Sequence, residues 1–433
     1  MPQTNCIEHA KLRLGASGHL LGAAVAAPTS TSLKWRRWWA LVPLCLALFC
    51  GDAHSGADDS AQDSTKERWG VEEAYVRFNY FDQKGFGYQS QAGPGPAGSE
   101  RLRVYEPMLY VRARQNSKVE HTVTVPVDII TSASTDAIDA TTSASLHNEA
   151  VTLNIDTRVQ STDDDELQFT YGAHVEEWYR SVFGGFGYTR DLAQDNATLS
   201  VRIDGSFDTF KPYGPWPGGI FPPGNQRDFR WALGGNAEVS QILNPTTWVK
   251  AGYGITWRQG ELLTPWNSVP FLCNSDVTQC LGRVQEKFPR TRFRHSVSGL
   301  LAHYFPKTKS TVRASYRFYA DNFDVRAHTL LGEVYQYVAE RAYISAHYRA
   351  HYQTAVYFWT TNLGLLDFDP SKPRTSDSDL AQFWAHEWGA KVLFHLSEPG
   401  RAHQHHLDVY YNRYTRTNNL SVNVASMGYG YNF

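Results

Sequence analysis

Long apolar runs are missing from most of this chain. After residue 50 no stretch approaches the roughly 20 apolar residues that a membrane helix requires, and the mean hydropathy is −0.43. A helical membrane protein is therefore excluded. The formal net charge is only −2 at pH 7, which argues against a nucleic-acid partner, because such partners normally call for a basic patch. The sequence also lacks a glycine-rich phosphate loop, His-Glu-x-x-His and Gly-x-Ser-x-Gly, so no common catalytic motif is present.

The one pronounced apolar run lies near the N-terminus. Basic residues at 34, 36 and 37 precede the run 38–50, and the small residues 55–57 follow it. A positive segment, a short apolar segment and a small-residue cleavage site are typical of a secretory signal peptide. A short membrane anchor is the alternative, but the run is too short to span a bilayer comfortably. We therefore expect an exported protein.

Cysteine is scarce, and three of the five cysteines lie in the N-terminal 50 residues. The remaining two, Cys273 and Cys280, are separated by six residues in a polar, turn-rich stretch. In an oxidising compartment this spacing indicates a small disulfide loop. A metal pair is the alternative, but no histidine lies nearby and the spacing does not fit zinc. We expect a disulfide that staples a loop, and we expect no metal and no other cofactor.

Aromatic residues are abundant, at 14% of the chain, and apolar residues alternate with polar ones along many segments. In residues 119–129, valine and isoleucine occupy most odd positions, whereas glutamate, threonine and aspartate occupy most even ones. Residues 197–204, 249–258 and 312–319 repeat the alternation. Such a pattern predicts strands with one apolar and one polar face. Aromatic girdles are a further property of outer-membrane barrels.

Sixteen segments of this kind can be counted, and the connections between them differ in length. Their centres lie near residues 76, 109, 125, 154, 172, 186, 202, 235, 253, 299, 316, 331, 350, 388, 410 and 427. Short connections such as 115–118 and 306–309 alternate with long ones such as 132–148 and 260–290. Barrels show this asymmetry, with short periplasmic turns and long outer loops. We therefore predict an all-β fold, a transmembrane antiparallel β-barrel of about sixteen strands.

A soluble β-sandwich or propeller is the alternative fold. A propeller would show a repeat for each blade, and none is visible. A sandwich core seldom extends past roughly 250–300 residues without dividing into domains. The expected organisation is a leader over residues 1–57 with the signal peptide at 34–57, a polar linker over 58–70, and a barrel over 71–433.

The C-terminus carries the strongest local signal. Counting back in twos from Phe433 gives Tyr431, Tyr429, Met427 and Ala425, all of which could face lipid. This resembles the terminal strand that the barrel-assembly machinery of Gram-negative bacteria reads. Phe433, Tyr431 and Tyr429 are therefore the expected assembly signal. The alternation changes phase before Ala425, which predicts a β-bulge there.

Five further stretches, in this order, resemble a family of outer-membrane barrels. They are Val127–Asp136, Ser240–Thr247, Gly260–Pro265, Ser315–Phe323 and His347–Gln353. The family is catalogued only as a domain of unknown function (DUF3570), and Phe323 departs from it, since a tryptophan is expected there. The resemblance implies a barrel in the outer membrane of a Gram-negative bacterium, with outer-membrane lipid and the assembly machinery as partners. It implies no activity.

Charged residues on the polar faces are the candidate functional residues. If the alternation holds, they line the lumen, and the candidates are Arg313, Arg317, Arg349, His347, His351, Lys250, Arg258, Glu106 and Asp128. Basic residues on later strands opposite acidic residues on earlier ones would create a transverse field that orients polar solutes. The alternative is that these groups pair with one another and only hold the lumen together. We predict a basic wall of Arg313, Arg317 and Arg349, with acids such as Asp321 as possible partners.

Three functions remain open at this stage. The sequence favours a pore or transporter for small polar or anionic solutes. The alternatives are a barrel-embedded envelope enzyme, for which no catalytic residue is identified, and a structural or adhesive anchor with binding loops. Conductance separates the first from the others, and the sequence does not name the solute.

Overall fold

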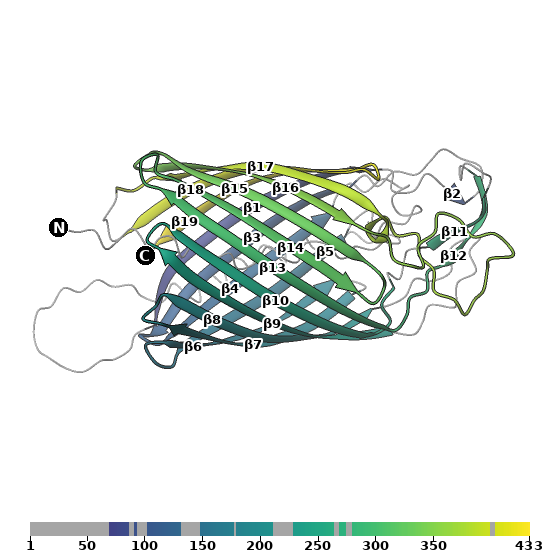
Figure 1. The fold of residues 1–433 in the computed structure, drawn as a ribbon, viewed down its shortest axis with the longest axis horizontal. Coiled ribbons are helices and arrows are strands. Elements are labelled where there is room, and N and C mark those ends of the chain that lie inside the picture. The colour runs from purple at the N-terminus through teal and green to yellow at the C-terminus, as the bar shows by residue number, and fades with distance from the viewer. Residues whose placement is uncertain are drawn as a thin grey trace, which may run out of the picture.

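Sixteen antiparallel strands form one closed barrel in the computed structural model (Figure 1). The structure describes residues 69–85, 91–92, 102–130, 148–176, 179–210, 228–263, 268–273, 279–398 and 403–433. The barrel strands are β1 (Gly70–Gly85), β3 (Leu102–Asn116), β4 (Val119–Ile130), β5 (Asn148–Gln160), β6 (Asp165–Glu176), β7 (Tyr179–Leu192), β8 (Ala197–Phe210), β9 (Asp228–Asn244), β10 (Thr247–Gly260), β13 (Thr291–Phe305), β14 (Ser310–Asp321), β15 (Arg326–Ala339), β16 (Ala342–Gln353), β17 (Phe383–His395), β18 (Gln404–Arg416) and β19 (Leu420–Asn432). Each predicted segment centre falls within one of these strands, so the sixteen-strand prediction is confirmed.

The barrel closes between its first and last strands. β1 and β19 pair antiparallel from Glu73 opposite Asn432 to Gly85 opposite Leu420. The start of β1 and the end of β19 therefore lie at the same end of the barrel. We call this the turn end, because short turns such as 117–118, 245–246 and 340–341 connect strands there.

The opposite end carries the longer connections, and we call it the cap end. Its connections include 261–290, as predicted, and 354–382, but also the short 322–325 and 417–419. β11 (Ser268–Cys273), β12 (Gln279–Gln285) and β2 (Gln91–Ala92) form a small separate sheet. This sheet lies beyond the cap end of the barrel (Figure 1). We call this sheet and segment 354–382, which includes the 3-10 helix η2 (Ser378–Leu380), the cap.

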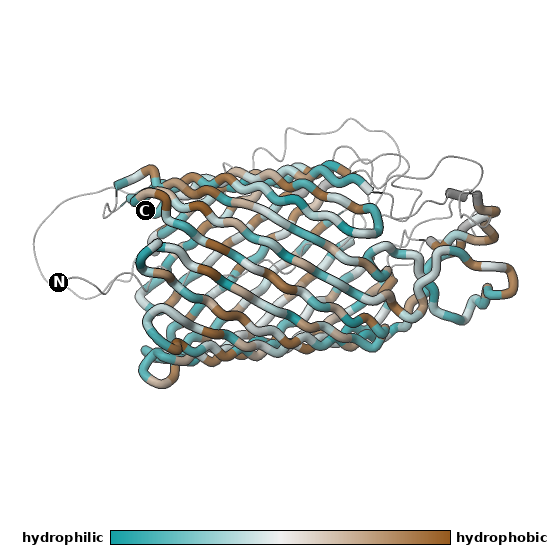
Figure 2. Tube along the Cα trace, turned by 45° about the horizontal axis from the view of Figure 1, so that its top comes forward, coloured by the Kyte–Doolittle hydropathy of each residue, from teal (hydrophilic) through white to brown (hydrophobic). Residues whose placement is uncertain are grey.

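Apolar and polar residues alternate along the barrel wall as the sequence predicts (Figure 2). On β13, Phe293, Val297 and Leu301 are exposed on the outside, whereas Arg292, whose side chain points to the opposite face, is buried. The outer face near the cap end also carries aromatic rings that contact one another. Trp231 and Trp257 have ring centroids 4.5 Å apart, and Trp257 stacks on Phe293 at 5.8 Å. An apolar outside with an aromatic girdle is the surface that a barrel presents to lipid.

No helix in the described part of the chain is long and apolar enough to cross a membrane.

The predicted bulge before Ala425 is wrong. β19 keeps an unbroken register with both neighbours, and Val424 lies opposite Phe81 on one side and Asn412 on the other. Val422 and Val424 simply point inward, and Asn423 points outward, where it accepts a hydrogen bond from Tyr411 at 2.9 Å. This part of β19 lies near the cap end. A strand that continues past the apolar band has no need of an apolar outer face, so the alternation inverts without a change of register.

The strand near residue 186 is also longer than its glycine content indicates. β7 has 14 residues and pairs along its whole length with β8. A Cβ on Gly185 would lie 3.0 Å from the guanidinium of Arg202 on β8. The glycine therefore makes room for a long inward side chain from the neighbouring strand.

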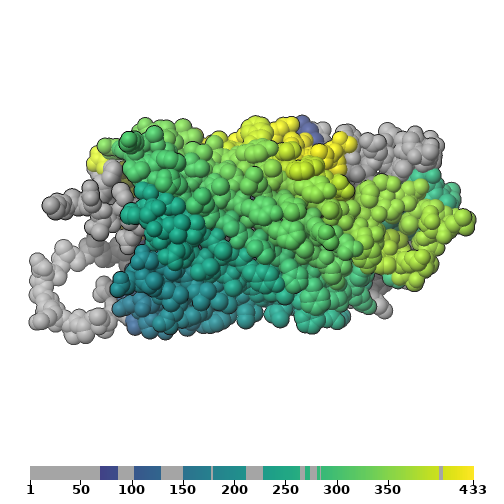
Figure 3. Space-filling model, in the orientation of Figure 1, coloured from purple at the N-terminus to yellow at the C-terminus, as the bar shows by residue number. Residues whose placement is uncertain are grey.

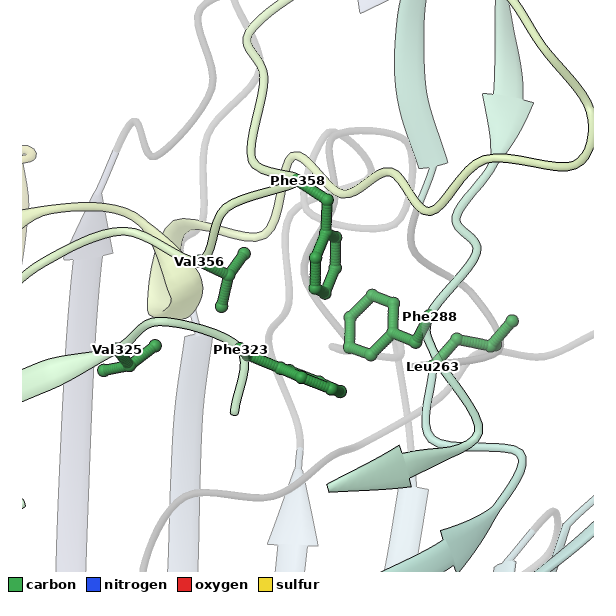
Figure 4. Close-up of a cluster of buried hydrophobic side chains, with 6 residues drawn as sticks. All are labelled: Leu263, Phe288, Phe323, Val325, Val356 and Phe358. Carbon is green, nitrogen blue, oxygen red and sulfur yellow. The ribbon is translucent and has the colours of Figure 1, made fainter. Parts of the chain in front are cut away.

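A hydrophobic cluster joins the cap to the barrel rim. Its buried members are Leu263, Phe288, Phe323, Val325, Val356 and Phe358 (Figure 4). They come from connections 261–290, 322–325 and 354–382, which follow different strands. Backbone pairs between Lys287 and Arg374 and between Phe271 and Leu363 extend this attachment outward. The outer segments therefore form a packed body continuous with the wall (Figure 3).

Candidate functional site in the barrel lumen

Four of the nine lumen residues predicted from the sequence, Lys250, Arg313, His347 and Arg349, lie within ion-pair distance of a carboxylate on a neighbouring strand. Lys250 donates a hydrogen bond to Glu238 at 2.9 Å across β9 and β10. Glu387 contacts both Arg349 at 3.1 Å and His347 at 3.2 Å. These pairs join neighbouring strands, and such pairing is how a polar wall satisfies its charges.

Two of the three arginines of the predicted basic wall have carboxylate partners. Arg313 lies 3.9 Å from the carboxylate of Glu333, and Arg349 is held by Glu387. The suggested partner Asp321 binds Arg292 instead. Arg317 is exposed on the same face of β14 as Arg313, and no ion pair involves it in the described part of the chain. Two of the three arginines are therefore tied to acids on the adjacent strand.

The other predicted lumen residues are Glu106, His351, Asp128 and Arg258. Glu106 accepts a hydrogen bond from Asn79 at 3.1 Å, across β1 and β3. His351 makes a hydrogen bond of 2.8 Å with Thr329. Asp128 belongs to β4, but its side chain lies outside the described residues. Arg258 is different, because it belongs to a cluster that the sequence analysis missed.

The predicted transverse field is weakened by arginines on the acidic side. Arg112 on β3 lies 3.3 Å from Glu73 and 3.6 Å from Glu120. Arg158 on β5 also contacts Glu120, at 3.6 Å. The acids near the turn end therefore share their charge with neighbouring cations.

A dense group of arginines lies inside the barrel near the cap end. Arg230 (β9), Arg258 (β10), Arg292 and Arg294 (both β13) make up this group, which we call the arginine cluster. Arg258 lies directly opposite Arg292 in the β10–β13 ladder. The positive charges of Arg230 and Arg292 repel that of Arg258. Those of Arg258 and Arg292 repel that of Arg294. Four guanidinium groups on three adjacent strands thus share one region of the lumen.

Two members of the arginine cluster have carboxylate partners. Arg230 donates to Asp208 at 2.9 Å, and Asp208 also accepts a hydrogen bond from Ser181 at 2.7 Å. Arg292 donates to Asp321 at 2.8 Å. No ion pair to Arg258 or Arg294 exists within the described residues, and the Nε atoms of both are buried without a hydrogen-bond partner. The cluster therefore carries an excess of positive charge.

A second charged centre lies nearer the turn end, beside the closing seam. Asp408 on β18 is 1% exposed and contacts Arg77 of β1 at 3.0 Å and Lys391 of β17 at 3.3 Å. It also accepts a hydrogen bond from Tyr75 at 2.6 Å. The ring of Tyr75 occupies the space that a Cβ on Gly428 would need. One buried carboxylate thus binds two cations and links three strands.

Threonine–histidine pairs recur across the wall. Thr152 contacts Nδ1 of His174 at 2.8 Å, and Nε2 of this imidazole lies 3.6 Å from the carboxylate of Glu176. A hydroxyl, an imidazole and a carboxylate that contact one another in this order are the groups that nucleophilic catalysis uses. The same pairing recurs between Thr157 and His121 without a carboxylate, as it does between Thr247 and His303. We therefore interpret it as a cross-strand packing motif of this sheet.

Among the described residues, no group of three His, Cys, Asp or Glu side chains is arranged to hold a metal ion. The histidines of the last turn contact tyrosines instead: His405 makes a 2.5 Å hydrogen bond with Tyr429, and His403 stacks on Tyr431.

The C-terminal aromatic residues lie at the turn end of the closing seam. Phe433 is 53% exposed, and its backbone N–H donates to the carbonyl of Glu72 at 3.0 Å. Its ring lies 4.5 Å from that of Tyr431, and Tyr429 is exposed on the same outer face. The residues have the outward arrangement that the pattern predicts, and their role as an assembly signal stays a prediction.

In the cap, Cys273 and Cys280 lie opposite each other on β11 and β12, and their sulfur atoms are joined. Their oxidation in the cell stays a prediction.

The cap also buries an acidic side chain. Glu286, 2% exposed, accepts hydrogen bonds from the hydroxyl of Thr375 and the backbone N–H of Ser376, whereas its second oxygen is buried without a partner. Burial, and to a lesser degree the nearby carboxylate of Asp377, raise the pKa of Glu286 well above its ordinary value.

Because the pKa of Glu286 is raised, we expect the attachment of the cap to depend on pH. A carboxyl group whose pKa is raised in the folded state stabilises that state fully below its unfolded pKa, and this stabilisation is lost as pH rises through the folded pKa. Amide hydrogen exchange of segments 284–288 and 374–377, corrected for intrinsic rates, should therefore speed up from pH 4.5 upward. Each unit of pKa elevation corresponds to about 1.4 kcal/mol, or tenfold in opening.

A Glu286→Gln variant should remove this dependence and protect the cap better at neutral pH, because the amide needs no proton to be neutral. An exposed control, Glu398→Gln, should leave the profile unchanged. Equal protection of the parent and the Glu286→Gln cap across the pH range would contradict the expectation.

A closed antiparallel barrel with an apolar outside and a charged inside is an outer-membrane β-barrel. The sequence match makes the relation more specific. Residues 40–430 match the model of a family described as "Protein of unknown function (DUF3570)", and the chain belongs to that family. The resemblance inferred from the sequence is thus confirmed.

Solved structures with a similar fold include outer-membrane barrels of Pseudomonas. OpdK from Pseudomonas aeruginosa is 8% identical with a TM-score of 0.41, covering 83% of this chain and 98% of that one. A BenF-like porin from Pseudomonas fluorescens Pf-5 is 8% identical with a TM-score of 0.42, covering 84% and 99%. Likeness at this level says nothing about what this chain binds or conducts. No curated protein matches the chain in sequence.

Proposed function

We propose that this chain is an outer-membrane pore for small polar solutes, including anions. The observation that carries the proposal is a closed ring of sixteen strands whose inner face bears charged and polar side chains. Barrels of roughly 16–18 strands are wide enough to leave an aqueous channel. Pairs such as Lys250–Glu238 join neighbouring strands along the wall.

The orientation follows from the connections. Short turns belong on the periplasmic side and long connections outside, so the cap faces the exterior. The signal peptide at residues 34–57 would export the chain, and the C-terminal aromatics would direct its assembly. A solute entering from outside would then pass the cap and the arginine cluster before the pairs nearer the turn end.

Planar-bilayer recording tests the pore directly. The purified full-length barrel should produce discrete conductance steps. Replacing Arg313, Arg317 and Arg349 together with Gln should shift the permeability ratio toward cations, because Glu333 and Glu387 lose their arginine partners and Arg317 loses its charge. The shift should be a few-fold, since each change alters a partly screened charge.

The recording also separates the pore from the alternatives. Absence of conductance from a folded, heat-modifiable preparation would reject the pore and leave an envelope enzyme or an adhesive anchor. Conductance with an unchanged ratio in the triple variant would show that the three arginines are only internal supports.

A further inference from the structure

The arginine cluster places like charges where a β-ladder normally avoids them. Arg258 and Arg292 occupy directly opposite positions on β10 and β13. Opposite residues in an antiparallel pair have Cβ atoms roughly 4.5–5.5 Å apart, and like charges there are destabilising. Arg294 lies two residues further along β13 and therefore points to the same side. Such an arrangement calls for compensating negative charge.

The carboxylates of the described wall supply only part of that compensation. Asp208 is used by Arg230, and Asp321 by Arg292. Asp321 is further occupied, since it accepts hydrogen bonds from the Tyr319 hydroxyl and the Val325 backbone. Arg258 and Arg294 remain as two cations whose Nε–H donors are buried with no acceptor among the described residues. A buried N–H donor without an acceptor costs free energy. The geometry is therefore that of a site suited to binding a ligand with oxygen acceptors.

Aromatic side chains fix the paired arginines in place. The guanidinium of Arg292 stacks on the ring of Phe323 at 4.6 Å, and that of Arg230 lies 5.5 Å from Tyr179 and 5.6 Å from Phe210. Phe323 belongs to the hydrophobic cluster beneath the cap (Figure 4). An apolar lid of this kind lowers the local dielectric, and electrostatic attraction to an anion is stronger there than in water.

We propose that the arginine cluster is a binding site for a dianionic oxyanion, held by Arg258 and Arg294. The inference deepens the proposed pore function, on which it rests for the route by which a ligand arrives. Four guanidinium groups against two carboxylates leave two positive charges, which a dianion neutralises. Guanidinium forks match carboxylate, sulfate and phosphate oxygens in paired hydrogen bonds. The ligand class is therefore a sulfate, a phosphate or a short dicarboxylate.

Thermal unfolding of the full-length barrel in detergent tests the site without any need for conductance. Sodium sulfate, inorganic phosphate and succinate, each compared with sodium chloride at equal ionic strength, should raise the melting temperature in a saturable way. Arg258→Gln and Arg294→Gln should each weaken the apparent affinity by roughly ten- to a hundredfold, the range expected for lost charge-assisted hydrogen bonds. Arg258→Lys should bind with intermediate affinity, because it keeps the charge but loses the fork.

Two features separate ligand binding from a merely structural role. Without dianion, Arg258→Gln should melt no lower than the parent protein, because it removes a like-charge contact with Arg292. Arg202→Gln is the matched control, an inward arginine on β8 outside the cluster, and it should keep the parent affinity.

Absence of saturable stabilisation would overturn the proposal, and so would an equal loss of affinity in Arg202→Gln. A barrel that conducts but does not bind dianions would reject the site and keep the pore. A barrel that binds dianions with the expected variant pattern but does not conduct would keep the site and reject the pore.

Discussion

Deleting Phe433 should leave most of the chain unassembled in cells. The residue closes the seam between β1 and β19, where its N–H makes the last backbone hydrogen bond, to Glu72. Its exposed ring and those of Tyr429 and Tyr431 form an aromatic group on the outer face of the turn end. If the assembly machinery reads this group, its loss stops insertion before the strands can pair. The measurement is the heat-modifiable fraction in isolated outer membranes, which should fall by an order of magnitude.

Two comparisons show whether recognition or stability is responsible. Phe433→Tyr keeps the ring and should assemble like the parent. The deletion variant, refolded from urea into lipid vesicles without any machinery, should form a barrel of nearly parent stability, because one terminal side chain contributes about 1.5–3 kcal/mol at most. Normal assembly of the deletion variant in cells would reject the terminal aromatic as a signal.

The strands of this barrel could be predicted because their pattern is local. Segments such as β4 and β10 alternate over ten or more residues, and a period of two is sufficient to identify such strands and assign their faces. The alternation fails where the outer face no longer meets lipid, as at Val422 and Val424 on β19. The bulge was wrongly predicted because lipid contact was assumed to continue along the whole strand.

Register could not be predicted in the same way. Arg258 and Arg292 face each other only because β10 and β13 pair across the connection 261–290, whose length leaves the register open. The sequence does show Arg292 and Arg294 on one face of a strand, and this signal could have been used. Their relation to Arg230 and Arg258, and the use of Asp321 by Arg292, depend on the three-dimensional pairing.

The Asp408 centre illustrates the same limit over a longer distance. Its partners Arg77 and Lys391 lie on β1 and β17, on either side of β18 and β19. Asp408 and Arg77 meet because the barrel closes, and no local pattern in the sequence encodes that contact. The sequence shows only that all three residues have inward parity.

Replacing Asp408 with Asn should be among the most damaging single changes in the wall. The substitution keeps the shape of the side chain but removes the charge that neutralises Arg77 and Lys391, both partly buried. Removing one partner of a buried ion pair leaves an uncompensated charge and costs about 3–5 kcal/mol. Urea unfolding of vesicle-reconstituted barrels, followed by tryptophan fluorescence, should show the midpoint shifted to lower urea by that free energy. The slope should stay constant, because the surface exposed on unfolding is the same.

The double variant Asp408→Asn with Lys391→Met should recover part of the lost stability, since it removes one of the two uncompensated cations along with the carboxylate. The surface pair Arg341–Glu398, with both side chains about half exposed, provides the matched control. Glu398→Gln should change stability by less than about 1 kcal/mol, as exposed ion pairs generally do. If Asp408→Asn were as mild as Glu398→Gln, water in the lumen would have to be screening this centre, and Asp408 would not hold the closing seam. If instead Asp408→Asn is strongly destabilising and the double variant recovers part of the loss, the carboxylate stabilises the barrel by balancing the charges of Arg77 and Lys391.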